Sequence, residues 1–94
     1  MSETKKELIE ILAGVTDEAQ MEGLLVELLT PREMKDIALR WQILKDLYLG
    51  GSQRQIAARH GMSLCKITRG SKQLKKKNSF TLKLLENLYK GAER

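Results

Sequence analysis

The sequence has one cysteine, one histidine and one proline among 94 residues, and only 4% of its residues are aromatic. The single cysteine, Cys65, excludes a disulfide bond within the chain. Cys65 and the lone His60 are too few for a zinc finger, so we expect no metal site. No cluster of carboxylates accompanies them, and nothing resembles a catalytic triad or dyad. We therefore expect a protein that is not an enzyme.

Long apolar runs are also absent. No stretch reaches the ~18 residues of a membrane-spanning helix, and no signal-peptide hydrophobic region follows the polar start. We expect a cytoplasmic protein without a membrane partner, because a reducing compartment suits a lone thiol. The length allows one domain at most.

Acidic residues are missing from the stretch between Leu47 and Leu85, although the chain contains 12 of them. That stretch carries nine basic residues, whereas the residues before it have more acids than bases. A merely solvated face usually mixes both signs of charge. The one-sided charge therefore predicts contact with a polyanion such as nucleic acid, with a solvated face as the alternative.

Aliphatic residues are plentiful, and they recur at the three- and four-residue spacing of helices. The pattern predicts six helices, no strand and an all-α fold. A core this thin favours oligomerisation. The predicted apolar faces comprise Leu8, Ile11, Leu12 and Val15; Met21, Leu24, Leu25, Leu28 and Leu29; Met34, Ile37, Ala38, Trp41, Leu44 and Tyr48; and Leu82, Leu85, Leu88 and Tyr89.

Capping residues mark where these helices begin and end. Thr30 and Glu33 predict a capping box at the start of the third helix, and Gly50-Gly51 predicts its end. Ser52 and Gln55 predict a second capping box, at the start of the next helix.

The segment from Gln53 to Leu74 has the spacing of a helix-turn-helix. The small Ala57 lets a second helix cross closely, and Gly61 permits a turn with positive φ. Ile67 then fills the angle between the two helices. Because the acid-free stretch covers this motif, we expect it to bind double-stranded DNA. The alternative is an RNA-binding or general nucleoid protein that uses only the basic charge.

The second helix of the motif is expected to begin after a Ser63 cap and to enter the major groove by its N-terminal end. The alternative for Cys65 is a small buried residue. Side chains expected to contact base edges are Leu64, Cys65, Lys66, Thr68 and Arg69. Those expected to contact phosphates are Ser52, Gln53, Arg54, Arg59 and Lys75.

Three segments resemble the bacterial tryptophan repressor family: Leu29-Thr30-Pro31, Ser52-Gln53-Arg54, and Ile67-Thr68-Arg69-Gly70-Ser71 followed by Leu74. The resemblance implies a six-helix, intertwined homodimer that represses transcription at a near-palindromic operator, with L-tryptophan as corepressor. It divides a single domain, 1–94, into a helical dimerisation core (1–50), a reading head (52–76) and a C-terminal helix that joins the core (79–91).

The resemblance also implies a ligand site. Arg40 and Arg69 would flank the indole ring, and Arg69 would bind the carboxylate with help from Thr30, while Gly70 would leave room for the ring. Thr30 is explained equally by its helix cap, and Arg40 by a solvated or ion-paired position.

Two features depart from the family pattern. Gln73 stands where the family has a ligand-contacting serine, and Gly50-Gly51-Ser52 is one residue shorter than the usual turn before the reading head. A helix-turn-helix regulator that answers to another small molecule, or to none, is therefore a second interpretation.

Overall fold

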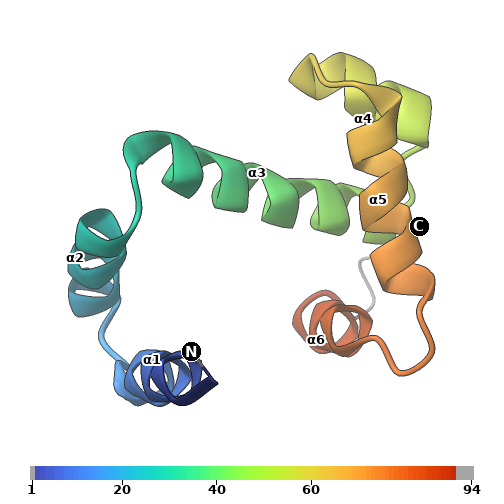
Figure 1. Cartoon of the computed structure of the whole chain (residues 1–94). Helices are drawn as coiled ribbons and strands as arrows, with labels where there is room; N and C mark the ends of the chain where they lie inside the picture. The colour runs from blue at the N-terminus through green and yellow to red at the C-terminus, as the bar shows by residue number, and fades with distance from the viewer. Residues whose placement is uncertain (1, 91–94) are drawn as a thin grey trace. The chain divides into compact units, whose positions relative to one another are not determined.

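The computed structural model describes residues 2–90, and within them the chain is entirely helical apart from turns (Figure 1). The predicted all-α fold with six helices is confirmed. None of these helices combines the length and the apolarity that crossing a membrane requires. The helices are α1 (Ser2–Gly14), α2 (Glu18–Leu28), α3 (Pro31–Tyr48), α4 (Gln53–His60), α5 (Leu64–Lys75) and α6 (Phe80–Leu88).

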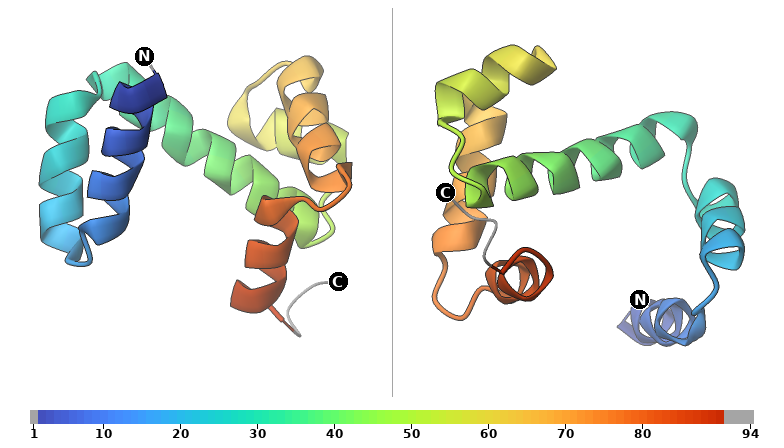
Figure 2. Two further views of the ribbon diagram at one scale, coloured as in Figure 1. Left: turned by 60° about the horizontal axis from the view of Figure 1, so that its bottom comes forward. Right: turned by 180° about the vertical axis from the view of Figure 1, so that it is seen from behind.

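The chain divides into two compact units, Met1–Asp36 and Ile37–Arg94, and the division falls within α3. The first unit contains α1 and α2, which a short turn joins (Figure 2). Asp17 caps α2 by accepting a hydrogen bond from the backbone nitrogen of Gln20 at 3.0 Å. Neither α1 nor α2 buries a residue within the chain. Ile9, Ile11, Val26 and Leu28 remain about half exposed.

The first turn of α3 carries the predicted capping box. The Thr30 hydroxyl accepts from the backbone nitrogen of Glu33 at 3.1 Å, and the Glu33 carboxylate accepts from the backbone nitrogen of Thr30 at 2.9 Å. Two of the free N–H groups at this helix end are thereby satisfied. The helix-cap explanation of Thr30 is confirmed.

The second unit is built around Ile43, Ile56 and Ile67, which come from α3, α4 and α5 and are almost fully buried. Figure 1 shows α5 beside α4, with α6 following it along the chain. Ile67 lies between the helices, as the helix-turn-helix spacing predicts. In the same unit, the ammonium group of Lys45 on α3 lies 5.0 Å from the centre of the ring of Tyr89, the residue that follows α6.

The predicted inner face of α3 is wrong within this unit. Ile43 is only 3% exposed, whereas Ile37 is 49% exposed and Trp41 is half-buried rather than in the core. The helix uses the face that contains Leu39, Ile43 and Leu47, because that face meets α4 and α5. Residues four apart share a helix face, and this series is offset from the predicted one.

The turns follow the predicted chemistry with one exception. Gly50 and Gly61 have positive φ, at 101° and 61°, and Gly61 ends α4. Ser52 and Gln55 form the second capping box, at the start of α4. Ser63 occupies the N-cap position of α5, but its side chain makes no capping hydrogen bond, so that prediction is wrong in its detail.

Candidate nucleic-acid interface

The helix-turn-helix of α4 and α5 is fixed locally by a hydrogen bond between its two helices. The Thr68 hydroxyl lies 2.8 Å from the side-chain oxygen of Gln53 and 3.0 Å from the backbone oxygen of Leu64, and it can donate to either. Gln53 is the first residue of α4, and Thr68 lies in the middle of α5. The structure therefore joins a predicted phosphate-contacting residue to a predicted base-contacting one.

The start of α5 presents its side chains to solvent. Leu64, Cys65, Lys66 and Arg69 are all exposed, so the alternative of a buried Cys65 is wrong. Leu64 and Cys65 can offer apolar contact, and Lys66 and Arg69 can donate hydrogen bonds. A hollow of about 370 Å³ lies on this surface, lined by Leu64, Cys65, Thr68, Arg69, Lys72 and Gln73.

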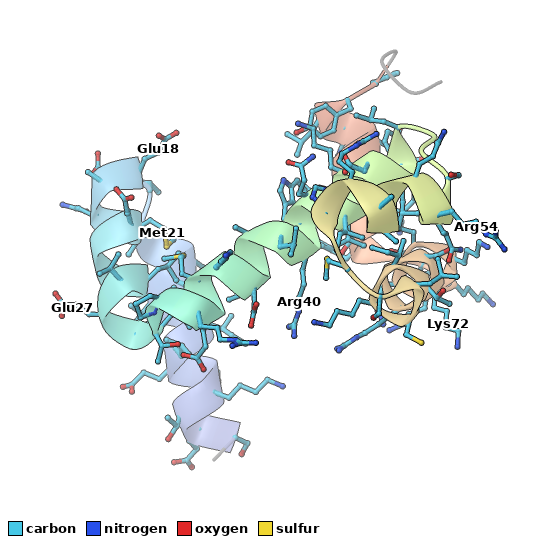
Figure 3. The ribbon with its side chains drawn as sticks, turned by 90° about the horizontal axis from the view of Figure 1, so that it is seen from above. Glu18, Met21, Glu27, Arg40, Arg54 and Lys72 are labelled. Atoms are coloured by element: carbon cyan, nitrogen blue, oxygen red, sulfur yellow. The ribbon has the colours of Figure 1, made fainter. Side chains whose placement is uncertain are left out.

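Positive charge continues along the same helix. Lys72 and Lys75 are exposed in its last turn, and α5 contains no acid. Figure 3 shows Arg54 on α4 and Lys72 on α5, with both side chains extending outward. At the start of α4, the backbone N–H groups of Gln53 and Arg54 have no partner within the helix and add to this positive potential. Anions are stabilised at such a helix end.

A different polar cluster forms where α4 ends. The side chain of Asp46, on α3, is only 10% exposed and accepts from the Gln42 amide at 2.8 Å. His60 Nε2 lies 3.0 Å from Asp46 Oδ2, and Arg59 Nη1 lies 3.4 Å from the same oxygen. Arg59, although predicted to contact phosphate, is thus ion-paired at the far end of α4 from Ser52 and Gln53.

The ionisation of Asp46 follows from these partners. Burial on its own raises the pKa of this carboxyl, but hydrogen bonds from His60 and Gln42 and the charges of Arg59 and His60 outweigh it, so the pKa is lowered. An ionised carboxylate only accepts hydrogen bonds, so Nε2 of His60 is the donor. Sequence reasoning missed Asp46, and its only signal was its place as the last acid before the acid-free stretch.

The residues of the expected ligand site lie on different helices and differ in their neighbours. Arg69 and Gln73 line the hollow on α5, whereas Arg40 is exposed on α3, where Figure 3 labels it. A side chain at Gly70 would lie 3.3 Å from Ile43 and 3.4 Å from Leu47. The space beside Gly70 is therefore already occupied by side chains of α3.

The shortened turn before the reading head is closed by the backbone. The Gly51 nitrogen donates to the Asp46 carbonyl at 3.0 Å, and the Gly50 nitrogen donates to that of Leu47 at 3.2 Å. A Cβ at Gly51 would lie 3.1 Å from the Ile56 side chain. The turn is therefore compact and admits no larger residue at Gly51 without a shift.

Comparisons with a family model and with individual proteins both match the chain to Trp repressors. Residues 3–88 match the family described as "Trp repressor protein". A "Trp operon repressor homolog" of Vibrio campbellii is 39% identical over 74 residues, which cover 78% of this chain and 74% of the relative. A homolog of the same name from Vibrio vulnificus is 31% identical over 90 residues, covering 95% of this chain and 88% of the relative.

A third relative has a similar sequence identity. A "Trp operon repressor homolog" of Xylella fastidiosa is 38% identical over 72 residues, or 76% of this chain and 78% of the relative. No solved structure gives a significant match.

Proposed function

Because the chain belongs to the Trp repressor family, we propose that it is a transcriptional repressor that binds a specific site on duplex DNA through α4 and α5. The observation that carries this proposal is the exposed start of α5, where apolar and hydrogen-bonding side chains stand together on an acid-free helix. Apolar contacts and donors at base edges distinguish sequences, whereas positive charge alone does not.

The side chains divide into two roles. Leu64, Cys65, Lys66, Thr68 and Arg69 contact base edges in the major groove, because the N-terminal part of the second helix enters it. Ser52, Gln53, Arg54 and Lys75 contact phosphates on either side and set the register. Arg59 is assigned to its ion pair with Asp46, although 58% of its side chain is exposed and a phosphate could compete for it.

The repressor acts as a homodimer in this proposal. Ile9 in α1 and Val26 in α2 are 54% and 61% exposed in the single chain, and a second copy would bury such side chains. A twofold dimer carries two copies of α5, so the site should be near-palindromic with half-sites about one turn of DNA apart.

Selection from a pool of random duplexes tests the proposal. The wild-type protein should enrich a near-palindromic sequence and bind it at least ~10³-fold more tightly than a scrambled duplex of the same length. Enrichment of no sequence, with equal affinity for every duplex and for RNA, would instead establish the nucleoid-type alternative.

The corepressor proposed is L-tryptophan, with its ring between Arg40 and Arg69 and its carboxylate on Arg69. A ligand that touches both α3 and α5 favours one angle of the reading head, and a coupling of ~1–3 kcal/mol would raise operator affinity about 5- to 150-fold. Family membership and the exposed guanidinium groups on the two helices support the proposal.

Calorimetry with L-tryptophan, indole and a panel of other amino acids tests this part. Arg40→Ala should remove the heat of tryptophan binding and the tryptophan-dependent gain in DNA affinity without loss of helicity. Gln73→Ser should tighten tryptophan binding if the larger side chain crowds the ammonium group, and weaken it if the amide oxygen accepts from that group.

A regulator that needs no tryptophan is the second candidate, and two observations favour it. Gln73 is larger than serine, and the side chains of α3 already fill the space beside Gly70. No heat with millimolar L-tryptophan, together with selective DNA binding that tryptophan leaves unchanged, would establish it.

A further inference from the structure

The buried carboxylate of Asp46 lies outside the surface described for DNA. Asp46 lies on α3, and its side chain contacts the last two residues of α4, Arg59 and His60. Desolvation of the carboxylate offsets part of the attraction to these partners, so the free energy they contribute is modest. Its directional hydrogen bonds do restrict how one helix can rotate or slide against the other.

Asp46 also holds the opposite end of α4. Its backbone carbonyl accepts from Gly51 at 3.0 Å, one residue before the Ser52 cap. One residue of α3 is therefore bonded both to the segment that leads into α4 and to the residues that end it. Between these two points Ile56 is fully buried, but apolar contact is non-directional and does not fix rotation by itself.

The constraint continues from α4 to the reading helix. Gln53 at the start of α4 is hydrogen-bonded to Thr68 on α5. A rotation of α4 on α3 would therefore move the side chains that face the groove. Base contacts depend on such geometry, whereas attraction to phosphates depends mainly on charge.

We propose that Asp46 is a positioning residue for DNA recognition: through His60 and Arg59 it sets the orientation of the reading head on α3, and it thereby controls sequence preference rather than general affinity. The proposal rests on the proposed function, because it presupposes a preferred DNA site. Asp46 touches no DNA in this scheme.

Asp46→Asn provides the test, with Glu86→Gln as the matched control. Both substitutions remove one negative charge, but Glu86 is exposed on α6. Loss of a negative charge alone should slightly strengthen binding to any duplex. We expect Glu86→Gln to behave in that way on the duplex selected by the wild-type protein and on a scrambled duplex alike.

Asp46→Asn is expected to differ between the two duplexes. Affinity for the selected duplex should fall about 2- to 30-fold, a range typical of residues that modulate a site without touching its ligand, while affinity for the scrambled duplex should not fall. Asp46→Glu, which keeps the charge but lengthens the side chain, should recover part of the preference. Circular dichroism at the temperature of the binding assay checks that each variant is folded.

His60→Leu replaces Asp46→Asn in the test if the latter does not fold, because the Asp46 carboxylate then keeps its contacts with Gln42 and Arg59. It too should lose affinity for the selected duplex only. The proposal is overturned if the folded Asp46→Asn protein, or His60→Leu in its place, binds the selected duplex as tightly as Glu86→Gln does, or loses affinity equally for the selected and the scrambled duplex. A wild-type protein that selects no duplex would instead overturn the proposed function, and the positioning role with it.

Discussion

At the scale of single residues, the ionisation of Asp46 makes the stability of the folded protein depend on pH. Its carboxyl is nearly buried but accepts from Gln42 and His60 and is paired with Arg59. These partners lower its pKa below the ordinary value of 3.8 that it would have in the unfolded chain. The ionised group therefore stabilises the folded state above that value, and this stabilisation is lost as the pH falls through the lower pKa of the folded protein.

Asp46→Asn should consequently reduce the free energy of unfolding at neutral pH by about 1–2 kcal/mol, because charged hydrogen bonds are replaced by neutral ones. The difference from wild type should shrink as the pH falls below 3.8, the ordinary pKa of the carboxyl. Urea unfolding of both proteins at one chain concentration measures it, with Glu86→Gln as the control. A difference that stays constant down to the lowest pH would contradict the assignment.

Two exposed lysines of α5 should distinguish sequence-specific contact with bases from electrostatic attraction to phosphates. Lys66 lies in the first turn and Lys75 is the last residue of the helix. Lys66→Ala should weaken binding to the selected duplex about 5- to 150-fold and relax preference at one base pair. Lys75→Ala should weaken binding to all duplexes similarly and reduce the slope of log affinity against log salt by about one.

Titrations of both lysine variants on selected and scrambled duplexes at several salt concentrations give the answer. Equal losses for the two variants on every duplex would show that Lys66 does not read a base.

At the scale of secondary-structure elements, the helix-turn-helix depends on a turn of three residues, Gly61 to Ser63, between α4 and α5. Gly61 has φ of 61°, and a Cβ added there would meet no atom within 4 Å. Glycine is therefore needed at this position for its backbone conformation, and not because a side chain would be crowded. Asn78, which precedes the Ser79 cap of α6, has φ of 59°, so the chain itself places asparagine in this conformation elsewhere.

Gly61→Ala should accordingly lower the free energy of unfolding by about 1 kcal/mol, because a left-handed conformation is unfavourable for alanine. Gly61→Asn should cost less, since asparagine tolerates that conformation. Chemical denaturation of the two variants distinguishes them. A larger loss for asparagine than for alanine would indicate that the turn is limited by contacts in the assembled protein instead.

At the scale of the whole molecule, apolar side chains remain uncovered. Ile9, Ile11, Val26 and Leu28 are each about half exposed, and neither of the helices that carry them buries a residue within the chain. Soluble monomers rarely expose so many large apolar residues in adjoining segments. The proposed homodimer would remove them from water.

Sedimentation equilibrium at micromolar concentration should therefore give twice the chain mass of 10.7 kDa. Val26→Glu should shift the equilibrium toward monomer, because it places a charge on an apolar surface. Gln20→Glu introduces the same charge at an exposed polar position of the same helix and should leave the dimer unchanged. A folded wild-type monomer at these concentrations would rule out the dimer.

The sequence by itself determined the helices and their order. The boundaries of the helices depend on local interactions, such as the capping boxes at Thr30 and Ser52 and the left-handed conformation of Gly61. Such interactions involve residues only three or four apart in the sequence. The helix-turn-helix could be predicted for the same reason, because Ala57, Gly61 and Ile67 have fixed spacing. The exposure of the residues at the start of α5 follows from that motif.

Only the tertiary structure decided which faces and partners these helices use. Several faces of α3 carry apolar residues, and the one containing Ile43 became the inner face because α4 and α5 fold back onto it. The same folding brings His60 to Asp46, 14 residues away, and fills the space beside Gly70 with Ile43 and Leu47. No spacing rule predicts such contacts, because they depend on the crossing of helices and not on the period within one helix.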